Sequence, residues 1–424
     1  MTEFRQQTWG NGLRIMTANL VVQVVAVALY PLVTRLYSPE TIGALSIFLA
    51  IVGILTTLAS ARYEQAIIAE HDNNIAGGLI LLCIGFIVCT STLVAAAERI
   101  IGADTISQWL KTPLLANYLW MVAPLVLLSA LGYMLTFVFN RQDRFSISAY
   151  YTAIQGVTGN VLRVILGACG MIASGLFWAN IFGQLIGVLA VIWRLPSVIR
   201  KLTIGTTHNN ITLAFTAMRR HWRFPAFNMP HALITTISNN LPIMILALSY
   251  PPESVGFFAL CITFGYKPVN IFALSMNQAL FQSASFNKNS GISNRSNFTT
   301  FVLRTSLVAI PVVILLYIIM PSVIPPLFGE QWTATTDIMR AILPLLLLTT
   351  LSTPLNFVPL LHNRQATALA IETTSSVCRI AVLIIVSQTT DLTTTTIWFA
   401  LTHSIFLTIQ LAWYISLEKE NPNK

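Results

Sequence analysis

Charged residues are scarce in this chain of 424 residues: only 9% are Asp, Glu, Lys or Arg, whereas 55% are hydrophobic. Soluble domains usually carry roughly 25% charged residues. With so few charges, most of the surface must face lipid rather than water. The length therefore corresponds to many membrane spans of about 20 residues each, and not to two or three soluble domains.

The sequence also lacks the patterns of metal sites and of nucleotide-driven enzymes. Its five cysteines all lie in apolar runs, as expected for small buried side chains: Cys83, Cys89, Cys169, Cys261 and Cys378. There is no G-x-x-x-x-G-K-[ST] loop, no serine elbow and no segment large enough for a nucleotide-hydrolysing domain. We therefore expect no cofactor, no metal and no enzymatic activity, and any transport must use an ion gradient, the membrane potential or downhill flux.

A short motif occurs twice in the chain. Tyr37–Gly43 (YSPETIG) returns as Tyr250–Gly256 (YPPESVG), 213 residues later, and each copy lies between two apolar runs. A motif that recurs after about half the chain length indicates a duplicated architecture. Pro-Glu is also a common start of a helix, so the two copies could be alike by chance. Ser38 is expected to cap the helix that follows it and Pro39 to take its first position. Pro251 offers no side-chain acceptor, so the second helix start should be weaker.

Apolar segments suggest an all-α membrane protein of about twelve transmembrane helices in two related lobes. The segments cover approximately 13–34, 42–62, 75–97, 115–139, 149–170, 174–193, 226–249, 255–281, 298–320, 338–361, 366–388 and 395–416. The longest connection separates six segments from six. We expect an N-terminal lobe over 1–200, a cytoplasmic interfacial linker over 201–225 and a C-terminal lobe over 226–424.

Basic residues predict the orientation, because Lys and Arg are retained on the cytoplasmic side. With the N-terminus inside, all but seven of the 24 Lys and Arg residues fall on inner segments or inner span ends. The exceptions are Arg35, Arg99, Lys111 and Arg340 outside, and Arg163, Lys267 and Arg379 within spans. Both termini are therefore expected in the cytoplasm.

The linker ends in a basic and aromatic segment, Met218–Pro225 (MRRHWRFP). Such a segment suits a short helix on the anionic inner leaflet. It is equally typical of positive-inside charges beside an aromatic residue at the membrane interface. No other basic segment interleaved with aromatics lies outside the spans, so the net charge of +9 does not indicate nucleic-acid binding.

A polar stripe is predicted on the eighth span. A charge at the centre of a span costs on the order of 2.5–3.5 kcal/mol, so Lys267 near the middle of this span requires an explanation. At roughly 100° per residue, Asn270, Asn277 and Gln278 share its side of the helix. Such a stripe faces a water-filled cavity or neighbouring helices. Lys267 is therefore a candidate substrate-binding residue, with the three amides lining a cavity or bracing the bundle.

Other charges within or beside spans are further candidates. Glu372 and Arg379 are seven residues apart, about 10 Å along one helix face, which we expect to be too far for a direct ion pair. Both would then face one cavity, with Glu372 a candidate for ion coupling. Arg163 is either a substrate contact or an interhelical brace. Arg14 and Arg62 lie near inner span ends, where snorkelling to the headgroups is the simpler explanation.

The seventh span is polar and interrupted. It contains Asn239 and Asn240, together with His231 and several prolines. Interrupted polar helices at the start of a second repeat often mark a transport path, although a single histidine is more often packed between helices. Because basic residues in the spans outnumber the one deep acid, Glu372, a phosphate-bearing substrate fits better than a cationic drug.

Several of these segments resemble a known family. Tyr30–Gly43, continued by Ala59–Ile67, resembles the start of Wzx-type polysaccharide flippases, of the multidrug/oligosaccharidyl-lipid/polysaccharide exporter superfamily. Shorter matches are Arg223–Pro230, Pro252–Gly256 and Leu327–Trp332. The resemblance implies two six-helix lobes facing a central cationic cavity. It also implies alternating-access translocation of undecaprenyl-diphosphate-linked oligosaccharide across the bacterial inner membrane. Arg62, in the A-S-x-R-Y-E motif, is the one cavity residue that the resemblance itself assigns.

Two other functions remain to be distinguished from a flippase for O-antigen or a related surface polysaccharide. A cation-coupled multidrug exporter of the same superfamily would have an acid-rich cavity. A polysaccharide polymerase or ligase would need a sugar-chemistry site at the outer face, where the longest loops, near 98–114 and 321–337, are small. The expected partners are the lipid-linked oligosaccharide and membrane lipid, with a polysaccharide polymerase and a chain-length regulator as further candidates, and no nucleic acid.

Overall fold

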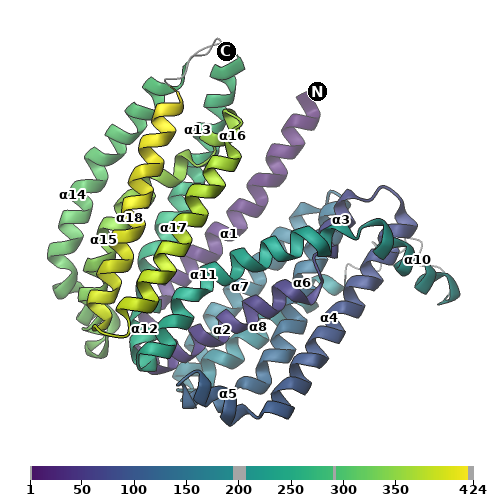
Figure 1. The fold of residues 1–424 in the computed structure, drawn as a ribbon. Coiled ribbons are helices and arrows are strands. Elements are labelled where there is room, and N and C mark those ends of the chain that lie inside the picture. The colour runs from purple at the N-terminus through teal and green to yellow at the C-terminus, as the bar shows by residue number, and fades with distance from the viewer. Residues whose placement is uncertain (1, 194–206, 290–292, 419–424) are drawn as a thin grey trace. The chain divides into compact units, whose positions relative to one another are not determined.

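The computed structural model describes residues 2–193, 207–289 and 293–418, and every regular element within these ranges is a helix (Figure 1). The chain divides into two compact units, Met1–Pro252 and Glu253–Lys424. Among the described residues, eleven helical segments are long and apolar enough to cross a membrane. The predicted all-α membrane fold is thereby confirmed.

The expected span at 149–170 is the one that is not among these eleven. It corresponds to α7 (Phe145–Ala168), which is long enough to span but carries polar side chains along much of its length. In unit 1, α7 packs against α1 (Thr2–Leu36) and α8 (Gly175–Ile192), so its polar residues lie among other helices.

Small residues allow α7 and α8 to approach closely. A methyl group added at Gly183 of α8 would lie 2.9 Å from the Gly159 Cα of α7, closer than carbon atoms can pack. Membrane helices associate through such small residues because lipid supplies no hydrophobic force between them. The pair of glycines therefore sets the separation of these two helices.

The remaining helices of unit 1 surround this pair and include short connecting turns. They are α2 (Pro39–Ala59), α3 (Tyr63–Ala69), α4 (Asn73–Ile101), α5 (Ala103–Trp109), η1 (Pro113–Asn117), η2 (Leu119–Met121), α6 (Val122–Arg141), α10 (Thr207–Arg220), η3 (Phe224–Asn228) and α11 (Met229–Ser249). The amphipathic helix α10 packs against α4, and α11 packs against α2. α11 belongs to unit 1, where it packs against α2. The predicted boundary between two lobes at residue 226 is not tested by this division and stays a prediction.

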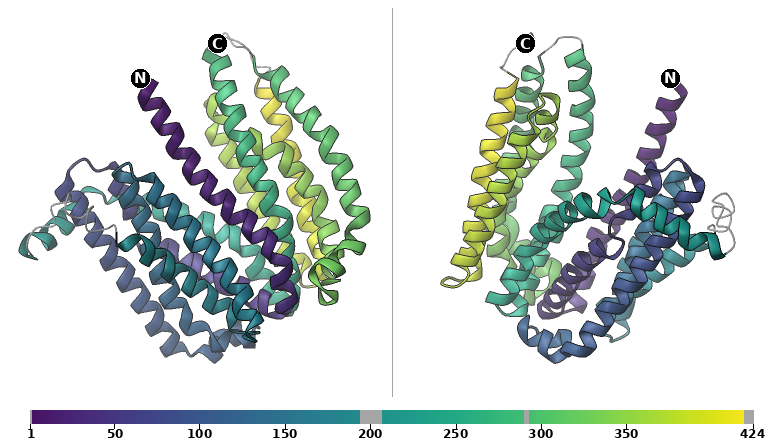
Figure 2. Two further views of the ribbon diagram at one scale, coloured as in Figure 1. Left: turned by 180° about the vertical axis from the view of Figure 1, so that it is seen from behind. Right: turned by 45° about the vertical axis from the view of Figure 1, so that its right-hand side comes forward.

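Unit 2 is a second helical bundle, green to yellow in Figure 1 and seen from two further sides in Figure 2. Its elements are α12 (Pro252–Cys261), η4 (Ile262–Tyr266), α13 (Lys267–Asn289), α14 (Arg295–Phe328), η5 (Glu330–Trp332), α15 (Thr335–Ser352), η6 (Thr353–Leu355), α16 (Val358–Leu361), α17 (Gln365–Val386) and α18 (Leu392–Leu417). α15 packs against α14 and α18, and α17 packs along α18. Trp332 is fully buried at the turn between α14 and α15.

The repeated motif begins a helix in each half. Ser38 has extended backbone angles, and its Oγ accepts the Thr41 N–H at 3.2 Å, so the predicted cap with Pro39 in the first position is confirmed. α12 begins at Pro252, directly after Pro251. The equivalent prolines of the two copies thus occupy equivalent positions at helix starts.

Candidate functional site

A polar cavity of about 380 Å³ lies within unit 1, between α2, α6, α7 and α8. From α6 it is lined by Ser129, Tyr133, Thr136 and Asn140. Spacings of four, three and four residues place these side chains on one face of the helix, over roughly 16 Å. The lining of α6 is therefore a neutral polar stripe.

A second polar stripe, on α7, faces the first, with Ser148, Tyr151, Thr152 and Gln155. Ser148 donates to Asn140 Oδ1 at 2.7 Å, which joins the two stripes at one end. This hydrogen bond holds hydroxyl and amide groups beside the cavity in a fixed arrangement.

The other two lining residues come from α8 and α2. Gln184 of α8 accepts the hydroxyl of the buried Tyr151 at 2.9 Å. Thr56 of α2 has a buried Oγ1 without a hydrogen-bond partner among the described residues. A buried hydroxyl without a partner is costly, so Thr56 is a locally unsatisfied residue in the cavity wall.

Arg62 lies at the margin of this cavity. It stands at the corner between α2 and α3, where its guanidinium lies 5.9 Å from the ring centre of the lining residue Tyr133. It also forms an ion pair with the buried Glu64, with 3.5 Å between Nη1 and Oε1. The Nε atom is buried without a hydrogen-bond partner among the described residues, as is the Nε of Arg163.

The backbone at Arg62 is strained. Ala61 and Arg62 both have left-handed backbone angles, with φ of 50° and 62°, which residues with a Cβ seldom adopt. The Ser60 hydroxyl donates to the Glu64 carboxylate, and the Tyr63 hydroxyl donates to the Met218 carbonyl of α10 at 3.4 Å. These contacts hold the corner between α2 and α3 in its strained backbone conformation. Strain of this kind is concentrated at functional sites, and the substrate-binding role of Arg62 stays a prediction.

Arg163 is engaged within unit 1. Its guanidinium donates to Asn160 Oδ1 at 3.2 Å and to Asn180 Oδ1 of α8 at 3.0 Å, and its backbone carbonyl accepts the hydroxyl of Tyr37, directly after α1. These contacts are those of an interhelical brace between α7, α8 and the end of α1.

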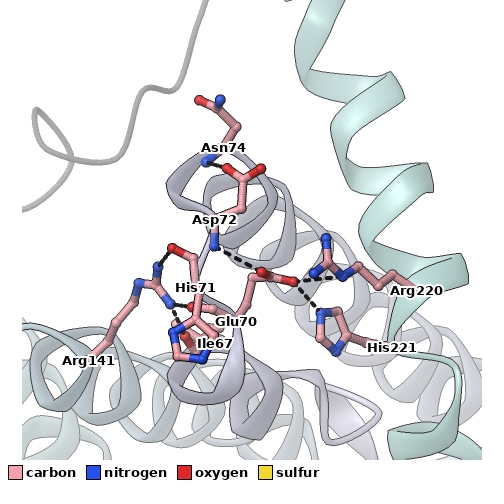
Figure 3. A network of polar contacts seen from close by, with 8 residues as sticks. All are labelled: Ile67, Glu70, His71, Asp72, Asn74, Arg141, Arg220 and His221. Atoms are coloured by element: carbon pink, nitrogen blue, oxygen red, sulfur yellow. Dashed lines mark hydrogen bonds and ion pairs between the residues drawn. The ribbon is translucent and has the colours of Figure 1, made fainter.

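A charged cluster joins α10 to the connection between α3 and α4 (Figure 3). Glu70, 3% exposed, lies 2.8 Å from His221 Nε2 and 3.1 Å from Arg220 Nε, and accepts the Asp72 N–H at 2.9 Å. From α6, Arg141 donates to the backbone carbonyls of Ile67, Glu70 and His71. Burial by itself would raise the pKa of the Glu70 carboxyl, but the hydrogen bonds from Asp72 and His221 and the charge of Arg220 lower it below its ordinary value.

A second charge pair, in unit 2, joins Glu372 to Arg379 on α17. Their side chains form a direct ion pair of 3.2 Å, so the prediction that seven residues are too far was wrong. The helical rise separates the backbones, but both side chains are long enough to close the gap. Gln410 of α18 donates to Glu372 at 3.1 Å, and Arg379 also lies 3.1 Å from a ring nitrogen of His403.

Lys267 follows an irregular turn. The π-helical segment Ile262–Tyr266 ends directly before it, and its side chain is exposed. Single π-helical turns inside α-helices are frequent at functional sites. The three amides predicted to share its side of the helix differ in their contacts. Asn270 and Gln278 are exposed, whereas Asn277 donates to Pro354 O at 3.1 Å and Asn356 Oδ1 at 2.7 Å. Asn277 thus supports the break after α15.

The last predicted site residues lie in unit 1. On α11, Asn239 is exposed and Asn240 donates to the Thr236 carbonyl at 2.8 Å within its own helix. Arg14 is on α1, but its side chain lies outside the described part of the chain. The structure therefore gathers Arg62 with the cavity, and Glu372 with Arg379, each within its own unit.

The sequence profile of a family described as "Polysaccharide biosynthesis protein" matches residues 32–337, well over half of the chain. The chain belongs to the polysaccharide biosynthesis protein family. The predicted resemblance is confirmed at this level. No curated protein sequence matches the chain.

Similarity to solved structures identifies the fold of this chain. The lipid II flippase MurJ in an inward closed conformation is similar with a TM-score of 0.71 and 13% identity, over 96% of this chain and 87% of that one. An inward-facing MATE multidrug resistance transporter of the MOP superfamily gives 0.64 at 14% identity, over 94% and 96%. An outward-facing MATE transporter of that superfamily gives 0.55 at 15% identity, over 96% and 95%. The family member therefore has the MurJ- and MATE-like fold of a multi-pass membrane protein.

The uncharged polar stripes of α6 and α7 that line the cavity were not among the site residues predicted from the sequence. Those candidates were chosen from charges and amides within spans, and the stripes of α6 and α7 contain no charge. Their signal was nevertheless present, because 129, 133, 136 and 140 follow the helical period. The Glu70 cluster was missed for another reason: it joins residues 151 positions apart, which no local pattern reveals.

Proposed function

We propose that this chain is a Wzx-type flippase, which moves undecaprenyl-diphosphate-linked oligosaccharide across the bacterial inner membrane by alternating access. One observation carries the proposal: a polysaccharide biosynthesis family sequence has the fold of a lipid II flippase over 96% of its length. Family and fold together favour a lipid-linked saccharide as the substrate and translocation, rather than sugar chemistry, as the activity.

The substrate's diphosphate requires cationic side chains along its path, because an unpaired charge is expensive within a membrane. Arg62 lies beside the cavity residue Tyr133, and Lys267 is exposed beside a π-helical turn. Both suit transient contact with phosphate oxygens, whereas the contacts of Arg163 suit bracing. In this account the lipid tail stays in the bilayer while the head group crosses.

Ion coupling would act at the Glu372–Arg379 pair. The side chain of Glu372 is 56% exposed and forms an ion pair with that of Arg379, which is 19% exposed. Binding of a cation at Glu372 would remove the competing negative charge and leave the guanidinium for a phosphate group. Ion binding at Glu372 would in this way be linked to substrate binding at Arg379.

A cation-coupled multidrug exporter is the second candidate, supported by the likeness to MATE transporters. A site for cationic drugs needs acidic side chains, and Glu372 is the one acid deep within an expected span. Its carboxylate is already paired with Arg379. The charge distribution therefore favours the anionic substrate.

Deletion of the gene in its source cells separates the two functions. We expect lipid-linked repeat units to accumulate and the surface polysaccharide to disappear, with unchanged drug susceptibility. Expression of the chain should reverse both defects. Increased drug susceptibility with normal polysaccharide would instead support the exporter. The same strain can test whether export depends on a polymerase and a chain-length regulator, the expected partners.

A further inference from the structure

The cavity of unit 1 has the size of a binding site for a small organic group. Its volume of about 380 Å³ falls within the roughly 300–1,000 Å³ that is usual for ligand pockets, and is far more than a single ion occupies. It is framed by α6 and α7, whose lining residues are fixed by hydrogen bonds, and by α8, which Gly183 holds against α7. The site is therefore preformed within one unit.

The chemistry of the lining selects an uncharged and hydroxyl-rich guest. The ten lining residues carry hydroxyl or amide groups, and none is Asp, Glu, Lys, Arg or His. An ionic group would enter without a counter-charge from the lining. Hydroxyls and amides both donate and accept hydrogen bonds, which is what the alternating donors and acceptors of a sugar ring require.

The margin of the cavity adds an aromatic face and a cation. Tyr133 is 44% exposed, and Arg62 lies next to its ring with an unpartnered Nε among the described residues. A saccharide carrying a diphosphate could thus place its sugar in the cavity and its phosphate beside Arg62. The amides of α13, predicted to line a cavity or brace the bundle, fit this role less well, because Asn277 is committed to Pro354 and Asn356.

We infer that the cavity between α2, α6, α7 and α8 binds a sugar residue of the transported lipid-linked oligosaccharide. This inference rests on the proposed flippase function and deepens it. Thr56 and Gln155 are the residues assigned to sugar binding, since both line the cavity and carry groups that can hydrogen-bond a sugar hydroxyl.

The inference is tested by direct binding to the purified full-length chain. The probe is the oligosaccharide released by mild acid from the lipid-linked pool of the source cells, with thermal stabilisation in detergent as the readout. Thr56→Val and Gln155→Met keep the side-chain volume but remove polar groups. Each should lower the apparent affinity by roughly two- to tenfold, the effect of one lost neutral hydrogen bond, and the double variant should lose more.

A matched control lies on the same turn of α2. Thr57 donates to the Gly53 carbonyl at 2.9 Å and does not line the cavity, so Thr57→Val should bind the oligosaccharide as the unmodified chain does. Melting of each variant without ligand shows whether it is folded. If Gln155→Met is not folded, Ser129→Ala, which removes one lining hydroxyl, takes its place.

The outcomes separate this inference from the proposed function. Equal affinity in all variants, in a chain that still flips the lipid-linked oligosaccharide, would overturn the cavity assignment and leave the function standing. Stabilisation by sodium chloride instead of by the oligosaccharide, lost in the Thr56 and Gln155 variants, would identify a cation site and also overturn it. Failure of the unmodified chain both to flip and to bind would refute the two together.

Discussion

At the scale of single residues, the two charge clusters differ in how their carboxylates are held. Glu70 is almost fully buried and faces Arg220 and His221, whereas Glu372 is more than half exposed beside Arg379. A buried carboxylate with several partners contributes to stability, and loss of its charge leaves those partners unsatisfied. An exposed carboxylate that is paired with one arginine is better suited to exchange its partner.

Glu70→Gln should destabilise unit 1 by about 1–3 kcal/mol at neutral pH, because Arg220 and His221 lose a charged acceptor. The pKa of Glu70 is lower in the folded chain than in the unfolded one. Its stabilisation is therefore complete above the unfolded value of roughly 4.3 and is lost as the pH falls through the folded value. Melting in detergent between neutral and acidic pH measures this, and the variant should show a flatter acid dependence.

Asp337→Asn is the matched control for Glu70. Asp337 is 66% exposed and lies 3.9 Å from Arg340, so its ion pair is worth about 0–1 kcal/mol. Equal destabilisation by the two substitutions would contradict the structural role given to Glu70.

Glu372→Gln should uncouple transport from the ion gradient, since Arg379 would lose its competing carboxylate. Export measured with and without a transmembrane ion gradient is expected to differ less in this variant. An unchanged dependence on the gradient would contradict the coupling role given to Glu372.

Lys267→Ala combined with Arg379→Ala should abolish export while membrane insertion persists, because the diphosphate would lose two cationic contacts along its path. The amount of surface polysaccharide measures export, and the amount of chain in the membrane fraction measures insertion. Undiminished surface polysaccharide in the double variant would rule out the cationic path through unit 2.

At the scale of helices, sequence patterns predicted the spans well and their interruptions poorly. Apolar length located the helices, and Ser38 predicted the start of α2. The π-helical turn before Lys267 and the break at Thr353–Leu355 lie at Pro268 and Pro354, whose missing N–H groups interrupt helical hydrogen bonding, but the form of each interruption was not predicted from the sequence. The ion pair of Glu372 was missed because backbone spacing was considered without side-chain length.

Gly183→Leu should prevent α7 and α8 from packing, since even a methyl group would clash with the Gly159 backbone. We expect loss of the folded, monodisperse fraction in size-exclusion chromatography. The control is Gly85→Leu on α4, where an added Cβ meets nothing within 4 Å. Similar yields from both variants would show that close packing of α7 and α8 is dispensable.

At the scale of the whole molecule, family and fold support one account. The sequence profile shows the polysaccharide biosynthesis protein family, and the solved structures show the MurJ- and MATE-like fold, on which the proposed transport function rests. The sequence by itself predicted the all-α class and the family, because both depend on composition and on contiguous motifs. The cavity of unit 1 required the structure, since its lining comes from four helices.

The central claim is most directly tested by lipid flipping in proteoliposomes. The purified chain is reconstituted with lipid-linked oligosaccharide from the source cells, and a membrane-impermeant glycosidase is added outside. We predict that the enzyme reaches the oligosaccharide of both leaflets in the presence of the chain, but only that of the outer leaflet in protein-free vesicles. Equal digestion in the two preparations, with intact vesicles and folded protein, would contradict the flippase assignment.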